Sequence, residues 1–143
     1  MLNELDHVGI VVGDLEEAIR MYTTLFGFSL RGRERVETQG MEIATVVLGS
    51  LKVELLHSTS ETGALSSFLT KRGPGVHHLA YRVRDIERSL SAMKDAGIRL
   101  IDERPRPGSD NALVAFLHPK DTGGVLIEFC EQRARPGRVL CDH

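Results

Sequence analysis

The chain has 143 residues, a length typical of one domain with its own hydrophobic core and too long for a small disulfide-held scaffold. Its 18 basic and 20 acidic side chains give a net charge of −2, which excludes binding to nucleic acid or an anionic membrane through overall charge. Hydrophobic residues make up 41% of the chain, and no apolar run approaches the roughly 18 residues of a membrane span. The acidic start of the chain is unlike a signal peptide, so we expect a cytoplasmic location.

The chain begins with a predicted strand and a predicted helix. Residues 6–12 form a β-branched run, and at Asp14 the spacing of apolar residues changes from two to nearly four. Asp14 is a candidate N-cap with Glu17 at capping-box spacing, and Gly27 is a candidate left-handed stop. Helical spacing predicts one core-facing side, made of Leu15, Ile19, Tyr22 and Phe26.

The pattern of strand, helix and shorter extended runs then occurs a second time. His7 aligns with His78 and Asp14 with Asp85 at the same offset of 71 residues, which indicates an internal repeat. The second predicted helix ends near Gly97, as the first ends near Gly27. The extended runs lie at 28–36, 41–49 and 51–57 in the first copy, and at 98–106, 112–119 and 124–131 in the second.

We predict an α+β fold in which two βαβββ modules pair about a pseudo-twofold axis into one curved mixed sheet, with helices on the outside. Neither half can bury both faces of a four-stranded sheet alone, so the two must pair. A single domain over 1–143 would contain module one at 5–57, a connector with a short helix at 58–75, module two at 76–131 and a tail at 132–143. We expect the tail to be solvated, and Cys130 and Cys141 to be ordinary thiols.

Four candidate metal ligands occupy matching places in the two copies: His7 and His78 in the first strands, Glu54 and Glu128 in the last. A single histidine or glutamate in a strand is more often a structural or solvated residue than a metal ligand. Both glutamates, however, lie inside apolar runs, where burial of an unpaired carboxylate is costly, and this favours a metal site. Two imidazoles and two carboxylates suit an octahedral Co²⁺, Mn²⁺, Ni²⁺ or Fe²⁺, or Zn²⁺, with two positions open. His77 has the opposite strand parity, so alignment with His7 selects His78.

Three segments carry a resemblance to a known family: KVELLH at 52–57, FLTKRGPGVHHLAYRV at 68–83 and FLHPKDTGGVLIE at 116–128. With the repeat and its four candidate ligands, they resemble the vicinal oxygen chelate superfamily of glyoxalases, bleomycin-resistance proteins and dioxygenases. Within it the chain is similar to the methylmalonyl-CoA epimerase family from about Leu5 to Glu131. The resemblance implies an isomerase that interconverts (2R)- and (2S)-methylmalonyl-CoA, removing the proton α to the thioester through a metal-stabilised enolate. It also implies a homodimer and the same four metal ligands.

One position departs from the family pattern. Many such epimerases carry Gln at the position of Glu54 and a catalytic Glu at that of Ile43. Glu42 lies one residue away, on the other face of a regular strand, so only a bulge could make it the base, and we do not assign it. We instead predict that Glu54 and Glu128 alternate as base and acid, by analogy with the two ligand glutamates of glyoxalase I.

An acyl-CoA substrate would bring phosphate groups that the net charge does not attract. Candidate substrate contacts are Lys71 and Arg72 in the connector and His118 and Lys120 in the HPKDTGG segment, although exposed cations more often only solvate a surface. Two alternatives stay open: glyoxalase I (lactoylglutathione lyase), which uses the same ligand set, and a metal-free binding protein of the same fold. A ring-cleaving dioxygenase is disfavoured, because a fourth ligand would crowd its iron site.

Overall fold

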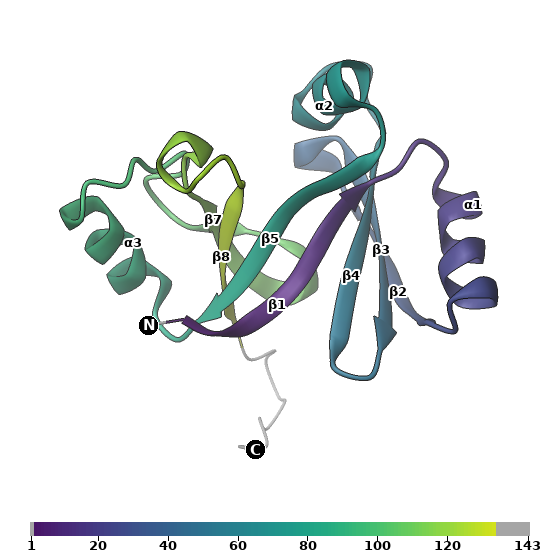
Figure 1. The fold of residues 1–143 in the computed structure, drawn as a ribbon, viewed down its shortest axis with the longest axis horizontal. Coiled ribbons are helices and arrows are strands. Elements are labelled where there is room, and N and C mark those ends of the chain that lie inside the picture. The colour runs from purple at the N-terminus through teal and green to yellow at the C-terminus, as the bar shows by residue number, and fades with distance from the viewer. Residues whose placement is uncertain (1, 134–143) are drawn as a thin grey trace. The chain divides into compact units, whose positions relative to one another are not determined.

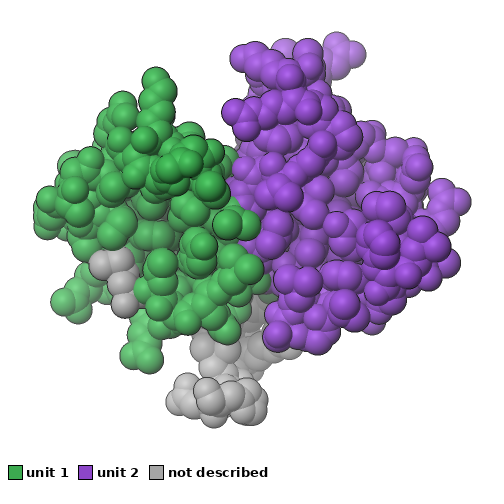
Figure 2. Space-filling model, in the orientation of Figure 1, with its two compact units in different colours: residues 1–6, 79–143 green, residues 7–78 purple. Residues whose placement is uncertain are grey.

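The computed structural model of the protein describes residues 2–133, in which two compact units are found (Figure 2). Unit 2 is residues 7–78, and unit 1 combines residues 1–6 with the chain from 79 onward. Strands β1 (Leu2–Val11) and β5 (Gly75–Val83) each run through both units. The part of the predicted tail from 134, with Cys141, lies outside the described residues, and no helix at 2–133 is long and apolar enough to cross a membrane.

The strands follow the hydrogen-bonded order β2-β3-β4-β1-β5-β8-β7-β6, which reads equivalently from both ends, as a repeat of one module requires. Their bounds are β2 Ser29–Val36, β3 Met41–Leu48, β4 Leu51–Ser58, β6 Arg106–Pro107, β7 Ala112–Phe116 and β8 Ile127–Gln132. The pairs β1–β4 and β5–β8 are parallel, whereas β2–β3, β3–β4, β6–β7 and β7–β8 are antiparallel. The predicted α+β class, with two β-α-β-β-β modules in a mixed sheet, is confirmed.

The helices begin where the capping residues predict. The α-helices are α1 (Leu15–Arg20), α2 (Ala64–Arg72) and α3 (Ile86–Asp95). Asp14 accepts a hydrogen bond from the backbone N–H of Glu17 at 3.0 Å, and Asp85 accepts one from Arg88 at 3.1 Å. Gly27 and Gly97 follow the helices with φ of 77° and 86°, the left-handed conformation that glycine adopts without strain.

One predicted core residue is exposed. α1 continues as a π-helical turn over Met21–Leu25, in which the N–H of Phe26 donates to the carbonyl of Met21, five residues back. A π turn takes one residue more than an α turn, so it rotates the following side chain away from the face that α-helical spacing predicts. Leu15 is buried, and Ile19 and Tyr22 are partly buried. Phe26 is 53% exposed, and its ring meets the Tyr22 ring edge to face with centroids 5.4 Å apart.

The extended run predicted at 98–106 is also wrong in length. Only Arg106–Pro107 forms a strand there, preceded by an isolated bridge between Leu100 and Leu117. Pro105 directly precedes this strand and has no N–H to donate, so a hydrogen-bonded ladder does not extend back through it.

In unit 2 the sheet has a helix-covered face and a second face that carries polar groups. Side chains of β1, β3 and β4 alternate between the faces. α1 packs on one face, beside β2, β3 and β4 in Figure 1, over a core that includes Ala44, Val53 and Leu55. The other face holds His7 and Glu54, together with a core cluster in which Val11, Ile43 and Leu56 pack against α2.

Unit 1 has the same division. α3 packs against β7 and β8 over a core that includes Val83, Leu90, Ala115 and Phe129. Glu128 and Cys130 lie on the opposite face, because they alternate with Phe129 along β8, and Cys130 is buried beside Ala112 and Val114. At the edge of this unit, Arg82 donates two hydrogen bonds, of 3.2 and 2.8 Å, to the buried carboxylate of Asp6.

Replacing Asp85 by alanine is expected to lower the free energy of unfolding by about 1 kcal/mol, because the orphan N–H of Arg88 loses its acceptor. Urea denaturation at neutral pH measures the difference. Ser91→Ala, an exposed position of the same helix, is the matched control and should change stability by less than about 0.5 kcal/mol. Equal stability of the two variants would show that the cap contributes nothing.

Candidate functional site

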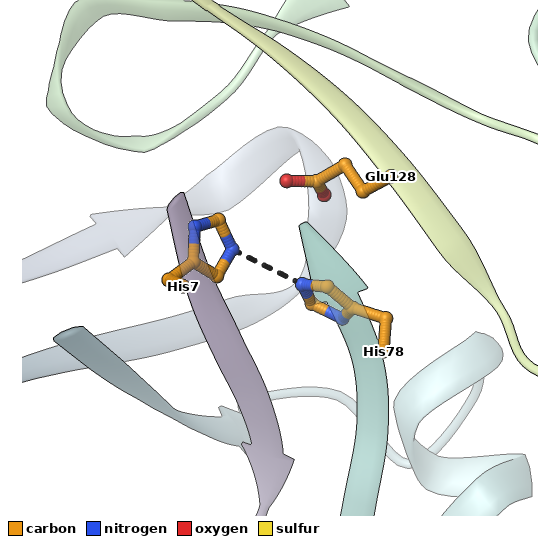
Figure 3. A group of neighbouring side chains, drawn as sticks. All are labelled: His7, His78 and Glu128. Carbon is orange, nitrogen blue, oxygen red and sulfur yellow. Dashed lines mark hydrogen bonds between the residues drawn. The ribbon is translucent and has the colours of Figure 1, made fainter. Parts of the chain in front are cut away.

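Three of the four predicted metal ligands converge within unit 2. His7 lies on β1, Glu54 on β4 and His78 on β5, and their exposures are 3%, 5% and 4%. The Nε2 atoms of His7 and His78 are 3.2 Å apart, and Nε2 of His7 lies 3.4 Å from Oε1 of Glu54. The two rings meet edge to face, with centroids 5.3 Å apart, and Figure 3 shows their nitrogen atoms facing each other.

Gly9 makes room for the His78 ring. It lies two residues after His7 on the same strand, opposite Glu54 in the register of β1 and β4. A Cβ atom at this position would lie 2.7 Å from Nε2 of His78 and closer still to two other ring atoms, which is far inside van der Waals contact. Gly9 is not among the residues predicted from the sequence. A signal was nevertheless present, because the repeat aligns Gly9 with Ala80, another small residue two positions after a histidine.

Glu128 belongs to unit 1. It lies on β8, is 6% exposed, and is opposite Ala80 in the parallel pairing of β5 and β8. Ala80 follows His78 by two residues on β5, so strand alternation places their side chains on the same face of that strand. Figure 3 labels Glu128 together with the two histidines.

His77 lies beside this group without being part of it. Its Nδ1 is 2.9 Å from Nδ1 of His78, and its ring packs against the edge of Phe68 on α2 with centroids 5.1 Å apart. Burial, and then the positive charge of Arg72, lower the pKa of His77. Of the two histidines, His78 is the one whose Nε2 lies 3.2 Å from Nε2 of His7.

Glu42 lies on the other face of the sheet. It pairs with His57 across β3 and β4, and its carboxylate accepts hydrogen bonds of 3.1 and 2.8 Å from Arg33. β3 and β4 keep a continuous register from Met41 to Leu48, so no bulge turns Glu42 toward Glu54.

The candidate substrate contacts lie in two places. Lys71 and Arg72 occupy the last turn of α2, where the Arg72 guanidinium lies 5.7 Å above the Phe68 ring. His118 and Lys120 belong to unit 1, at the 3₁₀ turn Pro119–Asp121, where Nδ1 of His118 accepts a hydrogen bond from the backbone N–H of Lys120. That bond caps the turn.

His78 predicts how stability depends on pH. Burial, reinforced by His7 and His77, holds the pKa of His78 well below its usual value of 6.5. Below pH 6.5 the unfolded chain therefore binds a proton that the folded chain does not, so stability falls as the pH falls. Urea denaturation with a chelator present should give a lower free energy of unfolding at pH 5.5 than at pH 7.5. The contribution of this one histidine to the difference is at most about 1.4 kcal/mol per pH unit. In His78→Asn the free energy of unfolding should depend less on pH than in the wild type. An equally strong pH dependence in this variant would show that His78 is not its source.

The fold and the ligand types define a class of protein, and comparison with known proteins agrees. The family profile of the Glyoxalase/Bleomycin resistance protein/Dioxygenase superfamily matches residues 6–116. The chain belongs to this superfamily.

Within the superfamily, the chain is similar to epimerases. It is 35% identical to the ethylmalonyl-CoA/methylmalonyl-CoA epimerase of Cereibacter sphaeroides, over 90% of this chain and 97% of that one. It is 36% identical to the mitochondrial methylmalonyl-CoA epimerase of Homo sapiens, over 89% and 73%. The crystal structure of methylmalonyl-CoA epimerase from Mycobacterium tuberculosis has a TM-score of 0.89 at 38% identity, over 93% and 90%. A methylmalonyl-CoA epimerase in complex with methylmalonyl-CoA and NH₄⁺ has a TM-score of 0.90 at 34% identity, over 94% and 97%.

Proposed function

We propose that this protein is a metal-dependent epimerase that interconverts (2R)- and (2S)-methylmalonyl-CoA. The observation that carries the proposal is the buried cluster of two imidazole nitrogens and a carboxylate oxygen in unit 2, with separations of 3.2 and 3.4 Å. The similarity to epimerases over about nine tenths of the chain supplies the substrate class.

The donor set fits a divalent cation. Two donor atoms that are each about 2.1 Å from one ion lie about 3.0 Å apart at a right angle and about 3.4 Å apart at the tetrahedral angle. Nε2 of His7 lies 3.2 Å from Nε2 of His78 and 3.4 Å from Oε1 of Glu54, and both separations match this range. We propose Glu128 as the fourth ligand, because it occupies in the second module the place that Glu54 occupies in the first. Without thiolate, the set suits Co²⁺, Mn²⁺, Ni²⁺, Fe²⁺ or Zn²⁺.

Epimerisation requires removal of the α-proton from one face and its return to the other. The bound cation would stabilise the negative charge that develops on the thioester oxygen. Glu54 and Glu128 come from equivalent strands of the two modules, and we propose that they alternate as base and acid. Ile43 lies opposite Leu56 and packs beneath α2, so the position at which many relatives carry a catalytic Glu is part of the apolar core.

Binding of the coenzyme A moiety is proposed to use the cationic side chains already named. Lys71 and Arg72 lie on α2, which packs on the same face of unit 2 as His7 and Glu54. Lys120 and His118 are the corresponding candidates in unit 1. We also propose a homodimer acting in the cytoplasm. Light scattering of the purified protein tests the dimer.

Proton exchange in deuterated water tests the activity. Metal-loaded protein is incubated with methylmalonyl-CoA, and deuterium entry at the α-carbon is followed by mass spectrometry. A parallel reaction contains the glutathione hemithioacetal. We expect exchange with methylmalonyl-CoA that stops on chelation and returns when Co²⁺ or Mn²⁺ is added. Exchange only with the hemithioacetal would identify a glyoxalase, and exchange with neither substrate would indicate a binding protein.

A further inference from the structure

His77 makes a direct polar contact with the proposed ligand His78. The two Nδ1 atoms are 2.9 Å apart, a hydrogen-bonding distance, and the ring planes are nearly perpendicular at 86°. We propose that His77 is a positioning residue: it accepts the Nδ1–H of His78 and keeps the Nε2 lone pair of His78 available to the metal. The inference rests on the proposed metal site and adds a residue that acts on the ion only through another side chain.

The assignment follows from counting protons. A neutral imidazole has one N–H and one lone pair. Nε2 of His78 faces Nε2 of His7, so it is the atom that would bind the ion, and the proton of His78 must then be on Nδ1. The 2.9 Å contact is therefore an N–H···N bond in which Nδ1 of His77 is the acceptor, which leaves the proton of His77 on Nε2. In the metal-free protein the contacts are then all compatible, since Nε2–H of His7 can donate to Nε2 of His78. When the ion binds, Nε2 of His7 must give up this proton, and a neutral His7 then carries its proton on Nδ1.

The acceptor itself is held in place from the other side. The edge of Phe68 packs on the His77 ring at 5.1 Å, and Phe68 also contacts the buried cluster that includes Leu56. Arg72 covers the Phe68 ring. A packed ring between α2 and the ligand loses little freedom when the hydrogen bond forms, so the bond can fix the orientation of His78. Through His77, the connector helix is joined to the metal site.

Two substitutions separate the hydrogen bond from the packing. His77→Phe keeps an aromatic ring against Phe68 but removes the acceptor. His77→Asn loses the ring, but its side-chain oxygen can accept a hydrogen bond close to the position of Nδ1. Loss of such an outer partner typically lowers metal affinity by 10–100-fold, so His77→Phe should weaken Co²⁺ binding by about that factor while His77→Asn stays close to wild type. Affinity is measured by titration against a competing chelator. Equal affinity in His77→Phe and wild type, or equal loss in both variants, would overturn the inference.

A second measurement does not depend on metal or on folding of a variant. Long-range ¹H–¹⁵N correlation spectra of the metal-free wild-type protein report which ring nitrogen carries the proton. We expect His78 protonated on Nδ1 and His77 on Nε2. The opposite tautomer of His78 would refute the positioning role even if the protein binds metal. Conversely, a wild-type protein that has these tautomers and binds no divalent ion would remove the metal site from the proposed function and leave the His77–His78 hydrogen bond established.

Discussion

Replacing Glu54 by glutamine is expected to reduce turnover of methylmalonyl-CoA by about 10²- to 10⁴-fold, the usual contribution of a general acid or base. Glutamine keeps a carbonyl oxygen at the place where Oε1 of Glu54 lies 3.4 Å from His7, so the variant should still bind the ion. It cannot accept and return a proton. Steady-state kinetics and a Co²⁺ titration of the same sample separate the two effects: the rate should fall and the metal content should not.

Glu42→Gln is the matched control for this experiment. It makes the same chemical change in the neighbouring strand, but Glu42 lies on the other face of the sheet and accepts from Arg33. Its turnover should equal that of the wild type. If Glu54→Gln is equally active, Glu54 is not the proton carrier. If Glu42→Gln is the inactive variant, the base lies on the face that the structure assigns to α1.

Replacing Gly9 by alanine is expected to abolish most metal binding, with a loss of at least about 10–100-fold in affinity. The added methyl group would overlap the His78 ring, so the ring must leave its position or the two strands must separate. Overpacking of this kind also lowers the free energy of unfolding, typically by about 1–3 kcal/mol. Isothermal titration with Co²⁺ and urea denaturation measure the two losses.

Gly13→Ala is the corresponding control. Gly13 lies four residues further along the chain, and a Cβ atom there would meet nothing within 4 Å. Metal affinity and stability should therefore remain near wild type. Full metal binding by Gly9→Ala would mean that the His78 ring does not need its present position, and the proposed ligand geometry would have to be abandoned.

The features that follow from a repeat or a local rule were predictable from the sequence. The offset between His7 and His78 identified two equivalent strands. Asp14 and Asp85 were predictable as N-caps because an aspartate just before a helix commonly accepts a hydrogen bond from a free N–H of the first turn. The alternation of side chains along a strand allows only one of His77 and His78 to face the site, and alignment with His7 selects His78. These inferences need only periodicity and spacing, which tertiary packing does not alter.

Other features depend on packing that spacing alone does not reveal. The π turn at Met21–Leu25 exposes Phe26, and nothing in its apolar spacing distinguishes it from an α turn. The contact of His77 with His78 contradicts the simple picture in which successive strand residues never meet, because both rings turn toward each other. The steric role of Gly9 required knowledge of which ring lies above it.

The passage of β1 and β5 through both compact units has a practical consequence for protein engineering. The chain passes from one unit to the other between Asp6 and His7 and again between His78 and Leu79. His7 and His78 are therefore the first and last residues of the continuous 7–78 segment. Excising that segment would create a new charged chain end directly at a proposed ligand. A split version intended for fragment complementation should instead be cut in an exposed turn such as Gly49–Ser50, which contains no proposed ligand.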